Sequence, residues 1–199
     1  MGGSRKIVKV GLVGTSCVGK SSLLEDLTAH LGSECEPVRE AARIFFMHHY
    51  QPEMGGRFSA PVQGMVQRVA QRNEKWADHY AALKYAKLGR VAIVCDRTVF
   101  DAPVYVAADG DEQGALDLLD QAYDWTKESP YDRIYLLDPA DVPYSTDPIR
   151  TELPETRQRF HDTYLEFFAL HGIAYELLRG SREQRLAGVA GSIAEAYTL

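Results

Sequence analysis

The stretch that decides the fold is GLVGTSCVGKSSLL, residues 11–24, in which glycines, a lysine and several hydroxyl residues follow an apolar segment. Residues 14–21 of this stretch match the phosphate-binding pattern GxxxxGK[ST]. The glycines let backbone N–H groups converge on a phosphate chain, and a following helix directs the positive end of its dipole to the same point. The stretch therefore predicts a loop (the P-loop) that holds the phosphates of a nucleoside triphosphate.

The residues of the P-loop have distinct expected roles. Lys20 supplies a positive charge for the β- and γ-phosphates and is a candidate catalytic residue, and the hydroxyl of Ser21 is a candidate ligand of Mg²⁺. A glycine-rich turn with a solvated lysine is the structural alternative. The apolar strand before the loop and the helical pattern at 20–31 favour the nucleotide site. The expected nucleotide contacts are Gly14, Thr15, Ser16, Cys17, Val18, Gly19, Lys20, Ser21 and Ser22.

Composition narrows the class of protein. The chain has 199 residues, of which 45% are hydrophobic and 25% charged, as expected for a single globular domain over residues 1–199. The net charge of −6 argues against nucleic acid or an anionic membrane surface as a partner. No apolar run approaches the ~20 residues of a membrane span. Three cysteines without metal-type spacing and an N-terminus without a signal pattern predict a cytoplasmic protein.

Apolar runs of strand length alternate with helical patterns along the chain. The predicted strands are 7–13, 35–40, 91–96, 133–138 and 174–178, and the predicted helices are 20–31, 60–87, 114–127, 154–170 and 182–197. This alternation predicts an α/β fold of three layers, with a central parallel five-stranded sheet. In such sheets ligands bind at the carboxyl ends of the strands, so the last residues of each strand are candidate site residues.

The segment VAIVCDRT, residues 91–98, places Asp96 and Arg97 at the carboxyl end of the third predicted strand. An aspartate there can hold Mg²⁺ through water or accept a proton from a substrate hydroxyl. Arg97 suits a phosphate or a sugar oxygen. Both are candidate catalytic residues, with Asp96 also a candidate for the metal site. The structural alternative is that Asp96 only caps the next helix.

Two classes of P-loop protein compete for this chain. The loop resembles that of small GTPases, which are binding switches and carry Asp-x-x-Gly after a strand and a guanine-reading Asn/Thr-Lys-x-Asp. Here Asp96–Val99 lacks the glycine, Asp111–Gly114 does not follow a convincing strand, and Thr126–Ser129 ends in serine. These departures favour a kinase that prefers ATP, and leave an NTPase or GTP-binding switch as the alternative.

In the order of its motifs, the chain resembles an AAA-type P-loop ATPase/kinase family. This family includes the ribosylnicotinamide kinase domain of bifunctional NAD-biosynthesis proteins. The matching segments are the P-loop, EPVREAAR (36–43), DRTVFDAPVY (96–105), YDRIYLLDPADVPYSTDPIR (131–150) and LEFFALHGIAYELLRGSREQRL (165–186). The resemblance implies an enzyme that uses ATP and Mg²⁺ to phosphorylate a hydroxyl of a small, nucleoside-like acceptor.

The acceptor side of the site is predicted in the segment PVREAAR, residues 37–43. The resemblance implies that Glu40 faces the acceptor hydroxyl as a positioning group or general base. A helix-start glutamate favoured by the helix dipole is the structural alternative. A third interpretation, a nucleoside monophosphate kinase, would use Arg39, Arg43 and Arg97 to clamp the acceptor phosphate. The acceptor's identity and the oligomeric state are not predicted.

A lid is predicted at about residues 139–159, where prolines and acids interrupt the helical pattern. The resemblance assigns Arg150 to the transferring phosphoryl group, because it follows Asp147 by three residues. Arg157 is the next candidate for the nucleotide, and Arg159 the one after; a solvated helix residue is the alternative for one of them. After the fifth strand, RGSREQR (179–185) either borders adenine or forms a helix cap, with Ser181 at the N-cap.

Overall fold

The computed structural model describes residues 6–143 and 154–198 of the chain. A parallel sheet forms the middle layer of the molecule. Its strands are β1 (Lys6–Val13), β2 (Cys35–Val38), β3 (Arg90–Asp96), β4 (Arg133–Leu137) and β5 (Glu176–Leu178). They lie in the order β2-β3-β1-β4-β5, and every neighbouring pair is parallel. The chain runs from β1 toward β2 and β3 and later crosses back to β4 and β5, so the strand order reverses beside β1. Ligands of open α/β sheets bind at such a reversal.

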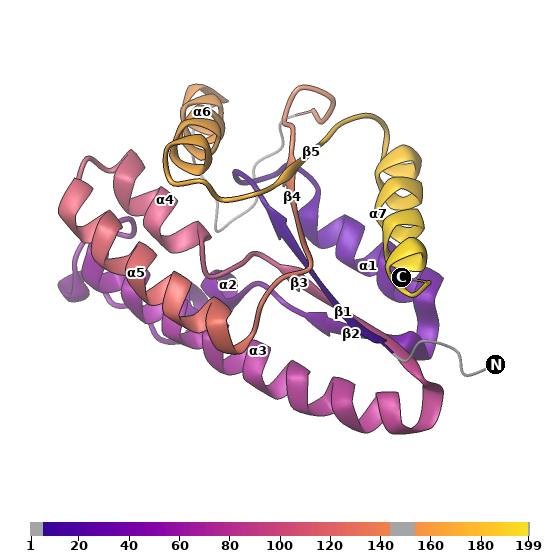
Figure 1. The fold of residues 1–199 in the computed structure, drawn as a ribbon. Helices are drawn as coiled ribbons and strands as arrows, with labels where there is room; N and C mark the ends of the chain where they lie inside the picture. The colour runs from indigo at the N-terminus through magenta and orange to yellow at the C-terminus, as the bar shows by residue number, and fades with distance from the viewer. Residues whose placement is uncertain (1–5, 144–153, 199) are drawn as a thin grey trace.

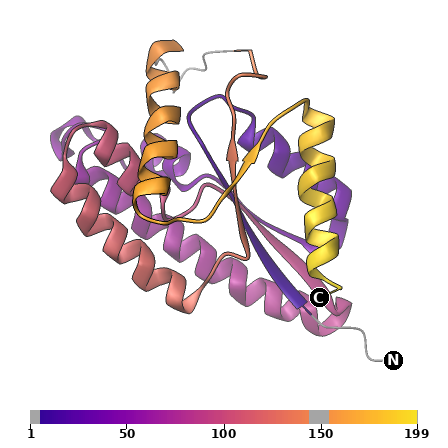
Figure 2. The same cartoon turned by 45° about the horizontal axis from the view of Figure 1, so that its top comes forward.

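Helices cover both faces of the sheet (Figures 1 and 2). Helices α1 and α7 pack on one face, and α3, α4, α5 and α6 lie on the other. The bounds are α1 (Lys20–Leu31), α2 (Ala41–His48), α3 (Ala60–Leu88), α4 (Asp101–Ala108), α5 (Glu112–Glu128), α6 (Pro154–Leu170) and α7 (Arg182–Ala196). A short 3-10 helix, η1 (Gly32–Glu34), connects α1 to β2, and a second one, η2 (Pro52–Met54), lies between α2 and α3.

The hydrophobic core follows the two-residue period of the strands. Val8, Val10 and Leu12 of β1 pack against the face covered by α1 and α7. Val13 packs on the other face, in the cluster that α4, α5 and α6 build. Successive side chains of a strand point to opposite faces, and here both faces are covered. For this reason the central strands appear in the sequence as continuous apolar runs. The predicted α/β fold with a five-stranded parallel sheet is confirmed.

The sequence pattern does not predict α2 and α4, and both border the site. Each has only eight residues, too few to show a helical period. In α4, the six residues from Asp101 to Val106 are all buried, so the helix has no polar face to mark it. The part of the chain that the structure describes contains no helix with the length and apolar character of a membrane span.

Candidate active site

The P-loop connects β1 to α1 and has the backbone that its glycines predict. Gly14 has φ +135°, and a Cβ atom there would lie 3.2 Å from the carbonyl oxygen of Leu137 in the neighbouring strand. Gly19, with φ +91°, is the N-cap of α1 in the left-handed conformation. A side chain is strained in both conformations. The loop can therefore turn tightly against β4 and present its backbone to a ligand.

The side chain of Lys20 lies back over the loop. Its Nζ donates hydrogen bonds to the carbonyl oxygens of Gly14 at 2.8 Å and Thr15 at 2.7 Å, and the residue is buried. These bonds hold the ammonium against the loop, where the N–H groups of the first turn of α1 also converge. The arrangement gathers positive potential at one point and suits a phosphate chain.

Ser21 and Asp96 join the start of α1 to the end of β3. The Ser21 hydroxyl donates a 2.6 Å hydrogen bond to Oδ2 of Asp96. The other carboxylate oxygen of Asp96 is buried and has no hydrogen-bond partner among the described residues. Burial raises the pKa of Asp96, and the negative charge of Glu40 raises it further. A cation bound beside this carboxylate would relieve both penalties.

Mg²⁺ fits these residues, because it prefers hydroxyl and carboxylate oxygens and usually keeps several waters. Ser21 and Asp96 are the two side chains that would hold it. Within residues 6–143 and 154–198, no group of three or more His, Cys, Asp or Glu side chains is placed to bind a metal ion. A Mg²⁺ site that also uses phosphate oxygens and water needs no such group.

Arg97 is fixed in a left-handed conformation, with φ +83°, at the end of β3. Its Nε donates to Oε1 of Glu40 at 2.7 Å, and its Nη1 donates to Asp101 Oδ1 at 2.9 Å and to the Tyr105 hydroxyl at 3.0 Å. Burial alone would lower the pKa of Arg97, but Tyr105, Glu40 and Asp101 together raise it well above its ordinary value. The guanidinium is therefore charged and held between two carboxylates.

The structural alternative for Asp96, a helix cap, does not describe its position, whereas Glu40 does lie at a helix start and pairs with Arg97 as well. Glu40 occupies the N-cap position of α2, but its side chain makes no capping hydrogen bond and turns to Arg97 instead. Arg43 also approaches Glu40, with its Nε 3.6 Å from Oε2. Asp96 lies before a turn, and the next helix, α4, has Phe100 as its N-cap. Both acids point toward the site.

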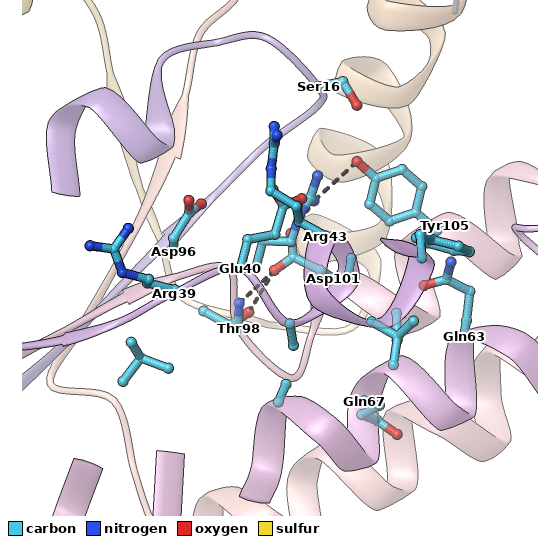
Figure 3. A pocket seen from close by; sticks show the side chains of 18 of the residues that line it. Ser16, Arg39, Glu40, Arg43, Gln63, Gln67, Asp96, Thr98, Asp101 and Tyr105 are labelled. Carbon is cyan, nitrogen blue, oxygen red and sulfur yellow. Dashed lines mark hydrogen bonds and ion pairs between the residues drawn. The ribbon is translucent and has the colours of Figure 1, made fainter. Parts of the chain in front are cut away.

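Glu40, Arg43, Asp96 and Arg97 border one pocket beside the P-loop (Figure 3). Its walls come from the P-loop, from α2 and α3, and from the turn between β3 and α4. Its polar and aromatic lining consists of Ser16, Arg39, Glu40, Arg43, Phe46, Arg57, Phe58, Gln63, Gln67, Glu74, Asp96, Arg97, Thr98, Asp101 and Tyr105. Small apolar side chains of α2, α3 and α4 fill the rest of the wall.

The sequence analysis does not identify Asp101, which organises this region. Its Oδ2 accepts from the backbone N–H of Thr98 at 2.7 Å, and its Oδ1 accepts from the Tyr164 hydroxyl of α6 at 2.6 Å. The same Oδ1 receives Arg97, four residues earlier. A signal was present in the sequence, because an acid four residues after Arg97 is close enough along the chain to pair with it. The aspartate fixes the conformation in which Arg97 meets Glu40.

The predicted lid arginines have different outcomes. Arg150 lies outside the described residues, as does the rest of 144–153 within the predicted lid. Arg157 is buried, and its guanidinium donates to the carbonyl oxygens of Pro139 and Val142, all at 3.0 Å. It thus anchors the first residues of the lid segment, and its contact with a nucleotide stays a prediction. Arg159 is exposed on α6.

A further arginine, Arg185 of α7, ties the P-loop to the neighbouring strand ends. It donates to the carbonyl oxygens of Val18 at 2.9 Å, Asp138 at 2.8 Å and Gly180 at 3.0 Å. The sequence analysis assigns it no role, because nothing local marks an arginine that serves distant carbonyls. Close by, Ser181 forms a complete capping box at the start of α7, which confirms the cap interpretation of that segment.

The segments compared with the GTPase motifs have structural roles. Asp111 is the N-cap of α5 and accepts from the backbone N–H of Gly114 at 2.9 Å. Ser129 is the C-cap of α5, just before the amino end of β4, and its hydroxyl bonds to Lys9 and Asp78. Ser129 therefore lies at the amino end of the strands, whereas the P-loop lies at their carboxyl end. Its identity gives no information about which base is bound.

Comparison with known proteins agrees with this geometry. A family model described as "AAA domain" matches residues 9–185. No curated protein matches the sequence. Two solved structures of NadR protein, one in complex with NAD and AMP-PNP and the other with NR, superpose with TM-scores of 0.61 and 0.62 at 16% identity. The match covers 98% of this chain and 50% and 51% of those chains, so this chain spans about half their length.

At this identity the two structures establish the fold alone. The family model is the stronger finding, because it covers most of the chain and includes the P-loop, Glu40, Asp96 and Arg185. The protein therefore belongs to the AAA-domain family of P-loop proteins.

Proposed function

We propose that the protein is a kinase that transfers the γ-phosphate of ATP to a hydroxyl of a small, nucleoside-like molecule. The observation that carries this proposal is the position of the pocket. It opens beside the P-loop and is bordered by two acids, Glu40 and Asp96, from the ends of neighbouring strands. A nucleotide switch needs the P-loop but no neighbouring site for a second small molecule.

Each residue has a role in this proposal. The P-loop and Lys20 bind the triphosphate, and Ser21 and Asp96 hold Mg²⁺, which neutralises phosphate charge when it is bound. Glu40 orients the acceptor hydroxyl or accepts its proton. Arg97 fixes the carboxylate of Glu40 and lies next to the P-loop, its Nη1 being 3.5 Å from the carbonyl oxygen of Gly14. Arg150, from the lid at about 139–159, would complete the phosphoryl site.

The charges in the pocket favour a nucleoside over a nucleoside monophosphate. The clamp considered for an acceptor phosphate consists of Arg39, Arg43 and Arg97, which all line the pocket. Arg97 already pairs with Glu40 and Asp101, and Arg43 approaches Glu40. An added phosphate would have to compete with these carboxylates. The NadR structure in complex with NR supports a nucleoside-like ligand on this fold. We expect the reaction to take place in the cytoplasm.

The test measures ADP formation with ATP and Mg²⁺ against a panel of nucleosides, nucleoside monophosphates and sugars, nicotinamide riboside included. ADP formation that requires one acceptor, with a stoichiometric phosphorylated product identified by mass spectrometry, supports the proposal. Hydrolysis at the same rate with and without every acceptor would instead favour the NTPase or switch. Lys20→Ala serves as the background, because it lacks the phosphate-binding charge.

A further inference from the structure

A second pocket lies beside the amino ends of β4 and β5, away from the P-loop. It is formed between the end of α5, the start of β4 and the segment that joins α6 to β5, and we call it the α5–β4 pocket. Its volume is about 410 Å³. Pockets of this size can hold a small molecule.

Tyr131 separates this pocket from the candidate active site. Its ring lines the α5–β4 pocket, and its hydroxyl accepts from the backbone N–H of Val99 at 3.1 Å and donates to Oε1 of Glu74 at 2.5 Å. Glu74 lines the pocket beside the P-loop, and the two pockets share no lining residue. What binds in the α5–β4 pocket therefore does not depend on the proposed kinase function.

Aromatic rings from several segments line the α5–β4 pocket. The buried ring of Phe100 contacts those of Tyr123 and Tyr131, which are inclined to it by 69° and 51°. Tyr175 lines the pocket from the segment just before β5. The Tyr123 hydroxyl donates to the carbonyl oxygen of His171 at 2.7 Å, which fixes this ring between α5 and the end of α6. Inclined rings around one space are the arrangement that binds organic cations through cation–π interactions.

One of these rings already contacts a cation of the protein itself. The Nζ atom of the buried Lys9 lies 5.0 Å from the centroid of the Tyr131 ring. Lys9 is paired with Glu74 at 2.6 Å, so it adds no net charge. Phe100, Tyr123 and Tyr175 are therefore the rings that a ligand would use.

The charges around the pocket also favour a cation. Asp132 lines it, and Oδ2 of this acid accepts from the backbone N–H of Lys9 at 2.7 Å, which holds the carboxylate in place. Among the described lining residues the only basic one is Arg133, and its guanidinium pairs with Glu176, which also lines the pocket. An anion would have to compete with Glu176 for Arg133, whereas a cation leaves this pair intact.

Two helices add to the negative potential. Both α5 and α6 end beside the pocket, whose lining includes Thr126 near the end of α5 and Gly172 just after α6. The carboxyl end of a helix carries a partial negative charge, and its effect is largest within the last turn. Acid, helix ends and aromatic rings thus favour the same sign of ligand charge.

We propose that the α5–β4 pocket is a second small-molecule site, which binds a compact organic cation with a quaternary ammonium group. The ammonium would lie against the rings of Tyr123 and Tyr175, with Asp132 as its counter-charge. A quaternary ammonium suits this lining because it has no N–H donor to satisfy and its methyl groups can pack on aromatic rings. A primary ammonium is more strongly hydrated and would lose more on entering the pocket.

Three small molecules of similar shape and different charge test this site: choline, its uncharged carbon analogue 3,3-dimethyl-1-butanol, and the anion 3,3-dimethylbutanoate. Each is titrated into the full chain, and two-dimensional NMR gives the affinity and the amides that respond. We expect choline to bind about two- to thirtyfold more tightly than the uncharged analogue, the range of cation–π contacts. The shifted amides should gather at residues 123–134 and 172–176.

Two variants test the assigned residues. Asp132→Asn removes the counter-charge and keeps an acceptor for the Lys9 N–H, so it should weaken choline about two- to fivefold and leave the uncharged analogue unchanged. Tyr175→Leu removes a ring and should also reduce the preference for choline. The matched controls are Asp124→Asn, an exposed acid of α5, and Tyr80→Leu, an exposed ring of α3; neither residue lines the pocket, and both variants should bind choline normally.

Several results would overturn the proposal. Equal affinity for choline and the uncharged analogue would remove the cation, and tighter binding of the anion would assign recognition to Arg133. No binding of choline at tens of millimolar, or shifts confined to the pocket beside the P-loop, would remove the site. Unchanged choline affinity in a folded Asp132→Asn would remove its counter-charge. Thermal unfolding verifies each fold, and Asp132→Asn keeps the test decisive if Tyr175→Leu does not fold, because Tyr175 also packs on Phe168.

Discussion

Arg97 and Glu40 form a buried ion pair of 2.7 Å that joins the carboxyl ends of β2 and β3. The arginine adopts a left-handed backbone conformation to make it, and Asp101 holds the arginine from the other side. Strained, buried and charged residues of this kind cluster at functional sites. The pair fixes the position of the carboxylate that the proposed reaction uses.

Replacing Glu40 tests its proposed role. Glu40→Gln should lower turnover by ~10²–10⁴-fold, the usual contribution of a general base, and change ATP affinity by less than about twofold. It should also lower stability by about 1–3 kcal/mol, because Arg97 loses one buried charged partner. Steady-state kinetics and urea unfolding measure both. Glu36→Gln is the control, since Glu36 lies on β2, shortly before Glu40, and pairs with the partly exposed Lys84 of α3. Full turnover in Glu40→Gln would remove Glu40 from the mechanism.

Removing the P-loop charge should weaken the nucleotide and spare the fold. Lys20→Ala loses charge-assisted hydrogen bonds to phosphate, so ATP should bind about ten- to a hundredfold more weakly. A fluorescent ATP analogue gives the affinity, and circular dichroism verifies the fold. Lys127→Ala removes an exposed ion pair on α5 and should change neither. Unchanged ATP affinity in Lys20→Ala would mean that the phosphates bind elsewhere.

The bond between Ser21 and Asp96 predicts that both act on Mg²⁺. Ser21→Ala and Asp96→Asn should each raise the Mg²⁺ concentration for half-maximal rate, by about 10–100-fold. Rates measured against Mg²⁺ at saturating ATP determine these values. The control is Asp26→Asn, because Asp26 pairs with Arg182 away from the pocket. If Glu40→Gln shifted the Mg²⁺ curve and Asp96→Asn did not, the roles of the two acids would be reversed.

Asp96 also predicts how stability depends on pH in the absence of Mg²⁺ and nucleotide. Burial raises its pKa in the folded state, so the folded protein binds this proton more tightly than the unfolded chain does. Stability should therefore fall as the pH rises from the unfolded pKa through the folded one. Asp96→Asn should remove this fall and stabilise the protein at neutral pH by on the order of 1 kcal/mol, or about 2–4 °C in Tm. Thermal unfolding from pH 4 to pH 8 compares the two proteins; parallel curves would contradict the prediction.

Base preference should favour ATP. The sequence contains no Asn/Thr-Lys-x-Asp segment, which is the group that reads guanine in GTPases. ATP and GTP titrated in parallel with Mg²⁺ should show the tighter affinity for ATP. If GTP bound tenfold more tightly, a difference of about 1.4 kcal/mol, the switch would become the better interpretation.

Local patterns determined the fold and the phosphate site. The P-loop could be predicted because its glycines, Lys20 and Ser21 are adjacent in sequence, and their conformations follow from their own chemistry. The alternation of apolar strands and amphipathic helices likewise predicted the parallel sheet. Asp96 and Glu40 became candidates because each is the last residue of a predicted strand, and parallel strands bring their carboxyl ends to the same end of the sheet.

Only the tertiary structure decided which of these groups meet and what each one does. Arg97 binds Glu40, 57 positions away in the chain, and Arg185 binds the carbonyl of Val18 across 167 positions. Such contacts depend on how the strands are ordered and how the helices pack, and no local pattern records them. Gln63 shows the same limit: in the sequence it is one polar residue of a long helix. Only the folded chain places it at the wall of the pocket beside the P-loop, where its nitrogen donates to the carbonyl oxygen of Arg57.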